Sequence, residues 1–223
     1  MALARFKDLC IDAVDPARLG GFWAAVLGLR VELSEDGDAV LRGDRPEQTV
    51  WVNRVPEPKT VKHRWHLDVH GSSPEDLEAL GATVLDGRSF PWIVMADPEG
   101  GEFCLFRRDS VPAYRLYELG VDCTDHELVG RWWGDVLGAR FSVDPSGFSF
   151  IEDVPGLPFE GIAFAAVPEP KTVKNRVHID VVADDLEALL AAGATLLRTL
   201  DAEIGWDVLA DPEGNEFCRF EST

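Results

Sequence analysis

A long internal repeat constrains the fold of this chain more than any other feature. The segment VPEPKTVKHRWHLDV at 55–69 returns as VPEPKTVKNRVHIDV at 167–181, with twelve of fifteen positions identical. Further pairs repeat in the same order: DPARLGGFWAAVLG with DHELVGRWWGDVLG, LEALGAT with LEALLAAGAT, and ADPEGGEFCLF with ADPEGNEFCRF. Two homologous units are therefore expected, 1–109 and 114–223, joined through the short polar segment RRDSVPA.

Composition places the chain among globular proteins, since 46% of its 223 residues are hydrophobic and 27% are charged. No run of about 18 apolar residues occurs, and the first residues lack the pattern of a signal peptide, so we expect a cytoplasmic protein with no membrane partner. The net charge of −19 would repel a phosphate backbone, which argues against nucleic acid as a partner.

The four cysteines, Cys10, Cys104, Cys123 and Cys218, form no C-x-x-C pair that would indicate a structural zinc knuckle. Cys104 and Cys218 occupy equivalent places in the two units and are poor candidates for a disulfide with each other. Free thiols in a reducing compartment are the simpler expectation.

Each unit reads as two strand–helix–strand–strand–strand modules. In the first module a strand, DLCIDAV, precedes a helix that Asp15 caps, Pro16 begins and Gly28 ends, and three short strands follow. The second module opens with RWHLDV, continues with a helix from Ser73 to Gly81, and closes with further strands around the turn at 97–100. We therefore predict an α+β fold of four βαβββ modules, with each helix on one face of a curved sheet and a cavity on the other.

Alternation along the repeated strand divides its side chains between two faces. Trp65, Leu67 and Val69 are apolar, whereas Arg64, His66 and Asp68 are polar and share the opposite face; in the second unit Arg176, His178 and Asp180 share it. A histidine and an aspartate two positions apart are good candidates for acid–base chemistry, which singles out His66, Asp68, His178 and Asp180. The competing interpretation is a salt-bridge network that fixes strand register.

Other candidate ligand-binding residues are Arg64 and Arg176 on the polar rows, Glu102 and Glu216 on the last strand of each unit, and Trp92 and Trp206 before the final hairpins. The tryptophans could form a pocket wall or belong to the core. No P-loop, dinucleotide-binding or nucleophile-elbow motif occurs, so nucleotide-binding and serine-hydrolase functions have no support.

The motifs D-P-x-x-L-x-x-F-W-x-x-x-L-G, K-x-R-x-H-x-D-V and D-P-E-G-N-E-F-C, in this order, resemble the glyoxalase/bleomycin-resistance/dioxygenase superfamily, also called vicinal oxygen chelate proteins. Within it the chain is most similar to the glyoxalase-like domain branch, and the resemblance covers both units. It implies tandem domains of paired βαβββ modules. It says less about activity, because this fold hosts lyases, dioxygenases, epimerases and drug-binding proteins.

The resemblance also implies where a metal would bind. Metal-dependent members place His or Gln on a module's opening strand and Glu on its closing strand, and His66 and His178 match the opening position of the second modules. In the first modules the opening position falls at Asp8 and Glu118, which are atypical there but could ligate. The closing Glu is replaced by Cys104 and Cys218. Most of the usual ligand set is therefore missing, and we expect no cofactor, with a divalent metal on His66, His178, Asp8 or Glu118 as the alternative.

The expected function is metal-independent binding of a small organic molecule. The alternative is a lyase, isomerase or dioxygenase acting on a small oxygenated substrate, and a third hypothesis makes one unit a structural partner of the other. The fused units would form an intrachain pseudo-dimer, in a monomer or a homodimer, and edge strands of one unit could pair with strands of the other.

Overall fold

The computed structural model describes residues 2–222 and contains two eight-stranded mixed sheets with four short helices. Unit one comprises β1 (Arg5–Ala13), α1 (Pro16–Leu27), β2 (Arg30–Leu33), β3 (Ala39–Arg42), a 3-10 turn (Pro46–Gln48), β4 (Val50–Arg54), β5 (Trp65–Gly71), α2 (Pro74–Glu78), β6 (Thr83–Asp86), β7 (Ile93–Ala96) and β8 (Glu102–Arg107). Unit two comprises β9 (Leu116–Cys123), α3 (His126–Leu137), β10 (Arg140–Asp144), β11 (Phe148–Glu152), β12 (Gly161–Ala166), β13 (Val177–Val182), α4 (Leu186–Ala191), β14 (Thr195–Arg198), β15 (Asp207–Ala210) and β16 (Glu216–Phe220).

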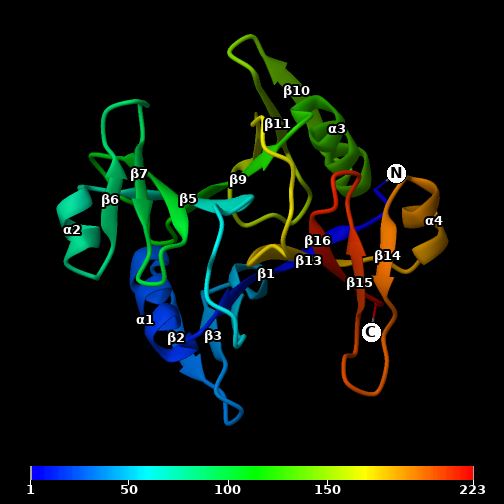
Figure 1. Cartoon of the computed structure of the whole chain (residues 1–223), viewed down its shortest axis with the longest axis horizontal. Coiled ribbons are helices and arrows are strands. Elements are labelled where there is room, and N and C mark those ends of the chain that lie inside the picture. The colour runs from blue at the N-terminus through cyan, green and yellow to red at the C-terminus, as the bar shows by residue number, and fades with distance from the viewer. Residues whose placement is uncertain (1, 223) are drawn as a thin grey trace.

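Each sheet takes one module from each unit. Sheet A has the order β14-β15-β16-β13-β1-β4-β3-β2, and sheet B has the equivalent order β10-β11-β12-β9-β5-β8-β7-β6 (Figure 1). The modules join where β1 pairs antiparallel with β13 and β5 pairs antiparallel with β9. The α+β fold of βαβββ modules is confirmed, as is pairing between strands of different units.

The helix boundaries follow from local chemistry. The Asp15 side chain accepts a hydrogen bond from the backbone N–H of Arg18, and Gly28 ends α1 with φ +74°. Asp125 and Gly138 do the same for α3. Helix α2 is shorter than predicted, because only its first five residues are helical and a turn leads to Gly81.

The core lies between the sheets, where each long helix packs on a strand of the opposite sheet. Phe22 and Trp23 of α1 contact Phe103 of β8, with ring centroids 6.0 and 5.2 Å apart. Trp132 and Trp133 of α3 contact Phe217 of β16 in the same way. These edge-to-face and tilted aromatic contacts connect the two sheets within each unit, and buried residues of both units form one hydrophobic core.

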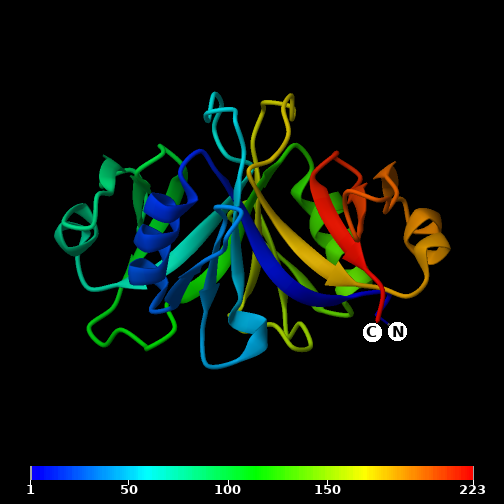
Figure 2. The same cartoon turned by 90° about the horizontal axis from the view of Figure 1, so that it is seen from below.

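The repeated segments before β5 and β13 project side by side from the molecule (Figure 2). They enclose a cleft of about 750 Å³ lined by 57–64 and 169–176 together with Asp12 and Asp122. Arg64 donates a hydrogen bond to the carbonyl of Glu169, and Arg176 donates one of 2.7 Å to the carbonyl of Glu57. The two arginines thus tie the segments to each other.

Among the helices of residues 2–222, none is both long enough and apolar enough to cross a membrane.

Candidate functional site

The predicted division of the repeated strand into two faces is confirmed. Trp65 and Leu67 are 1% exposed and belong to the core, whereas His66 and Asp68 lie on the opposite face of sheet B. We call this the site face of the sheet. His66 Nε2 is 3.3 Å from Asp68 Oδ1, and Cys104 stands next to Asp68 on β8, so that all three offer ligand atoms within 4.8 Å of one another.

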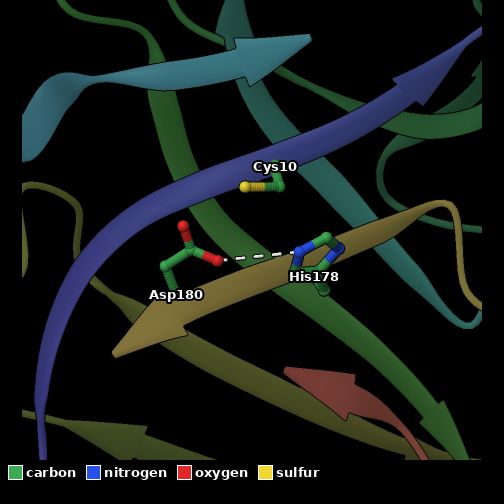
Figure 3. A group of neighbouring side chains, drawn as sticks. All are labelled: Cys10, His178 and Asp180. Carbon is green, nitrogen blue, oxygen red and sulfur yellow. Dashed lines mark ion pairs between the residues drawn. The ribbon is translucent and has the colours of Figure 1, made fainter. Parts of the chain in front are cut away.

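Sheet A carries an equivalent cluster on its site face. Cys10 of β1 points toward His178 and Asp180 of β13, and the ligand atoms of these three residues also lie within 4.8 Å of one another (Figure 3). His178 Nε2 is 3.6 Å from Asp180 Oδ1 and 3.5 Å from the Sγ of Cys218 on β16. Each predicted His–Asp pair therefore lies next to one or two cysteines.

One row of side chains across each sheet makes the two site faces different. In sheet B the register aligns His66 with Gly120, Gly120 with Ala163, and Ala163 with Phe150. The His66 ring lies over Gly120, and the small side chain of Ala163 separates Gly120 from Phe150 in this row.

In sheet A the corresponding row is His178, Cys10, Trp51 and Val40. The Trp51 indole stands where sheet B has the methyl group of Ala163, and its Nε1 donates a 3.2 Å hydrogen bond to Asp8. The side chains of Asp8, His178 and Asp180 are 10% exposed or less. This row of sheet A is therefore bulkier than the corresponding row of sheet B.

Gly120 is required by its neighbour. A Cβ at this position would lie 2.2 Å from Nε2 of His66, much closer than non-bonded atoms approach. The missing side chain is what allows the His66 ring to lie across β9.

Aromatic rings lie beside this row on the site face of sheet B. Trp92 stacks on Phe106 at 5.5 Å and meets Phe148 of the other module edge-on at 6.2 Å. Phe106 contacts Tyr117 at 4.9 Å. A pocket of about 190 Å³ opens beside them, and its lining includes Tyr117, Glu118, Phe150, Glu152 and Glu160.

The electrostatics of sheet B favour a protonated cluster. Burial alone would lower the pKa of His66, but the Asp68 carboxylate and hydrogen bonds to Asp68 and Cys104 outweigh it and raise this pKa well above its ordinary value. Burial, reinforced by Asp68 and Glu160, raises the pKa of Glu118 to about 8. At neutral pH Glu118 is therefore mostly a neutral hydrogen-bond donor.

Sheet A has the opposite balance. Burial lowers the pKa of His178 to about 4 and raises the pKa of Asp180 to about 7. Burial also raises the pKa of the Cys10 and Cys218 thiols. Without a bound cation, this cluster is close to neutral.

The residues predicted to bind the ligand lie apart from these clusters, with one exception. Arg64 and Arg176 tie the projecting segments together, and Glu102 and Glu216 anchor them: Glu102 accepts hydrogen bonds from Lys59 and from the backbone of His63, and Glu216 does so from Lys171 and Asn175. Trp206 packs on Phe220. Trp92 is the exception, since it forms part of the aromatic wall of sheet B.

Sequence reasoning missed Cys10, Gly120, Phe148 and Phe150 as site residues. Strand alternation alone places Cys10 on the same face as Asp8 and Asp12, so that signal was present. Gly120 comes into the site through register between strands of different units, and Phe148 and Phe150 follow through the register of β11, β12 and β9, which no local pattern reveals.

The donor sets of both clusters fit a divalent metal that tolerates sulfur. Each joins an imidazole, a carboxylate and at least one thiol. Within residues 2–222, Asp180 Oδ1 is a buried atom without a hydrogen-bond partner, which a bound cation would satisfy.

Paired βαβββ modules with polar clusters on their site faces define a fold of the vicinal oxygen chelate class. The family model described as "Glyoxalase-like domain" matches residues 8–106 and 118–220, and the chain belongs to this family. A comparison with curated protein sequences finds no match.

Solved structures share the fold over nearly the whole chain. Glyoxalase I from Zea mays is 16% identical with a TM-score of 0.72, covering 98% of this chain and 92% of that one. A putative dioxygenase from Bacillus subtilis is 13% identical with a TM-score of 0.67, covering 99% and 86%. The cppA protein from Streptococcus pneumoniae is 11% identical with a TM-score of 0.55, covering all of both chains.

Proposed function

We propose that the protein binds a small organic molecule on the site face of sheet B. The observation that carries this proposal is the pocket of about 190 Å³ on sheet B, whose lining includes Tyr117, Glu118 and Phe150. It lies beside the small residues Gly120 and Ala163, where the equivalent row of sheet A carries Cys10 and Trp51. We therefore assign ligand binding to sheet B and a structural role to sheet A. Each sheet contains one module from each unit, so the two roles are divided between the sheets and not between the units.

The lining indicates the chemistry of the ligand. The rings of Trp92, Phe106, Phe148 and Phe150 favour a planar, partly apolar molecule. Glu118, Glu152 and Glu160 contribute acidic groups to the adjoining pocket, and no Lys or Arg is among the residues that line it. A ligand with an aromatic ring and an amino group suits both features.

Substituting a large side chain into the site face of sheet B tests this function. Ala163→Trp introduces into sheet B the residue type that fills sheet A, and we expect it to abolish binding of aromatic amines of the phenethylamine type, measured by calorimetry and thermal shift. Val143→Trp, at an exposed position of β10, is the control and should bind as the wild type does. Undiminished binding by the Ala163→Trp variant, or no binding of these amines and of matched arylacetates by the wild type, would refute the proposal.

A second function is favoured by the donor group of sheet B. His66, Asp68 and Cys104 lie together on the site face, and the His66 side chain is 17% exposed, so a bound metal there would be open to a substrate. Such a metal supplies Lewis-acid stabilisation of a developing oxyanion, and His66 and Asp68 would hold it. This would make the protein a lyase, isomerase or dioxygenase. Stoichiometric metal that is lost in His66→Ala, but retained in the exposed-residue control Glu78→Ala, is the result expected for this function.

A further inference from the structure

The cluster of sheet A contains more sulfur and less solvent than that of sheet B. Cys10 and Cys218 approach His178 and Asp180 from β1 and β16, the strands on either side of β13. The four residues are 3–8% exposed. In sheet B the counterpart of Cys10 is Gly120, so that cluster has a single thiol.

One polar atom of the cluster points to an absent partner. Among the residues that the structure describes, the buried Asp180 Oδ1 has no hydrogen-bond partner, and His178 turns its Nε2 toward it. Neighbouring groups do not supply one, because Asp8 is occupied by Lys7 and by the Trp51 indole. Buried unsatisfied polar atoms are rare in folded proteins, and a bound ion is one of the features that account for them.

The donor types match a closed, thiophilic site. Two thiolates, one imidazole and one carboxylate are ligands that zinc prefers, and four protein ligands without an open position are typical of structural zinc sites. Ligand atoms around tetrahedral zinc are about 3.3–3.8 Å apart. Cys10, His178 and Asp180 already present theirs within 4.8 Å, so shifts of about 1 Å would suffice for these three.

We propose that the sheet A cluster binds one thiophilic divalent cation of the zinc type through Cys10, Cys218, His178 and Asp180, and that this closed site stabilises the junction between the two units. Binding exchanges the two thiol protons, and the Asp180 proton where present, for the cation. The site lies where β1 of unit one pairs with β13 of unit two. The cation would therefore link Cys10 to His178, which are 168 residues apart in the chain. It takes no part in the ligand binding proposed for sheet B.

Cobalt substitution and metal analysis test this site on the full chain, purified without a metal-affinity tag. We expect one equivalent of zinc per chain, and for the cobalt form a thiolate-to-cobalt charge-transfer band in the near ultraviolet. Cys10→Ser and Cys218→Ser, which keep the size of the side chain, should each lose much of this band and bind Zn²⁺ about 100-fold more weakly. A chelator should lower the melting temperature of the wild type but not that of the serine variants.

Two other cysteines provide matched controls. Cys123 is buried outside both clusters, so Cys123→Ser should leave the band unchanged. Cys104→Ser tests the thiol of sheet B and should also leave it unchanged. The proposal is overturned if the wild type shows no thiolate band when titrated with Co²⁺, or if Cys104→Ser removes the band while Cys10→Ser retains it. Neither result affects the ligand-binding experiment, which reads sheet B.

Discussion

The carboxylate of Glu99 accepts a 2.8 Å hydrogen bond from the backbone N–H of Asp15, the residue that caps α1. It accepts a second hydrogen bond, of 2.9 Å, from the backbone N–H of Val14 and forms an ion pair with Arg176. Because Glu99 lies in the turn between β7 and β8 of sheet B, whereas α1 follows β1 of sheet A, this contact joins the two sheets. Glu213 repeats it on Thr124 and Asp125 in unit two.

Removing this contact should destabilise the fold. We expect Glu99→Ala and Glu213→Ala each to lower the free energy of unfolding by about 2–4 kcal/mol, because each change leaves two backbone N–H groups without their charged acceptor. Urea denaturation measures the effect. Glu78→Ala, at an exposed position of α2, should stay within about 0.5 kcal/mol of the wild type. Equal stability of all three variants would contradict this role of the DPEG turn.

The arginines of the repeated segment should govern loop mobility. Arg64→Ala and Arg176→Ala each remove hydrogen bonds between the projecting segments. We expect amide exchange within 57–63 and 169–175 to accelerate about tenfold. Arg64→Lys should not restore the wild-type rate, because an ammonium lacks the planar fork that lets Arg64 reach the carbonyls of Asp122 and Glu169 together.

The same variants test the sequence-based prediction that Arg64 and Arg176 bind the ligand. From their position in the cleft between the segments, we expect amine binding on sheet B to change by less than about twofold. A much larger loss of affinity would restore them as ligand-binding residues.

Gly120 should tolerate no side chain. Gly120→Ala places a methyl group against the His66 ring, and we expect a loss of about 1–3 kcal/mol in stability together with weaker ligand binding. The matched change in sheet A, Cys10→Gly, should leave ligand binding on sheet B intact. Chemical denaturation and calorimetry on both variants distinguish the two effects, and an unperturbed His66 resonance in Gly120→Ala would show that the contact is not tight.

Glu118 should make stability fall as pH rises. Folding raises the pKa of its carboxyl from 4.5 to about 8, so its contribution to stability is fully present below about pH 4.5 and is lost as pH rises through 8. Asp68 on β5, Glu152 on β11 and Glu160 face it and reinforce the shift, while His66 opposes it.

The variant Glu118→Gln keeps the shape but removes the titration. Relative to the wild type it should gain stability between pH 6 and pH 9, by up to about 1.4 kcal/mol for each pKa unit crossed. Glu127→Gln, at an exposed position of α3, is the control. Parallel pH profiles for the wild type and Glu118→Gln would rule out this contribution.

Much of the local structure could be predicted from the sequence. Asp15 and Gly28 indicate the two ends of α1. Period-two alternation places Trp65 in the core and His66 on the other face. These features depend on residues a few positions apart, whose geometry is the same wherever the segment packs. The metal ligands were harder to predict, because a cysteine stands on the last strand of each unit where a glutamate is expected. Whether that cysteine binds a metal depends on the residues around it.

The sequence by itself determined that this protein has two homologous units, four βαβββ modules and two His–Asp pairs facing away from the core. Only the tertiary structure decided which modules share a sheet, because the repeated segments are nearly identical and carry no local preference for their own unit over the other. It also decided that small residues stand beside His66 in sheet B and bulkier ones beside His178 in sheet A. That difference arises from cross-strand register, which brings Gly120 to His66 and Cys10 and Trp51 to the side of His178.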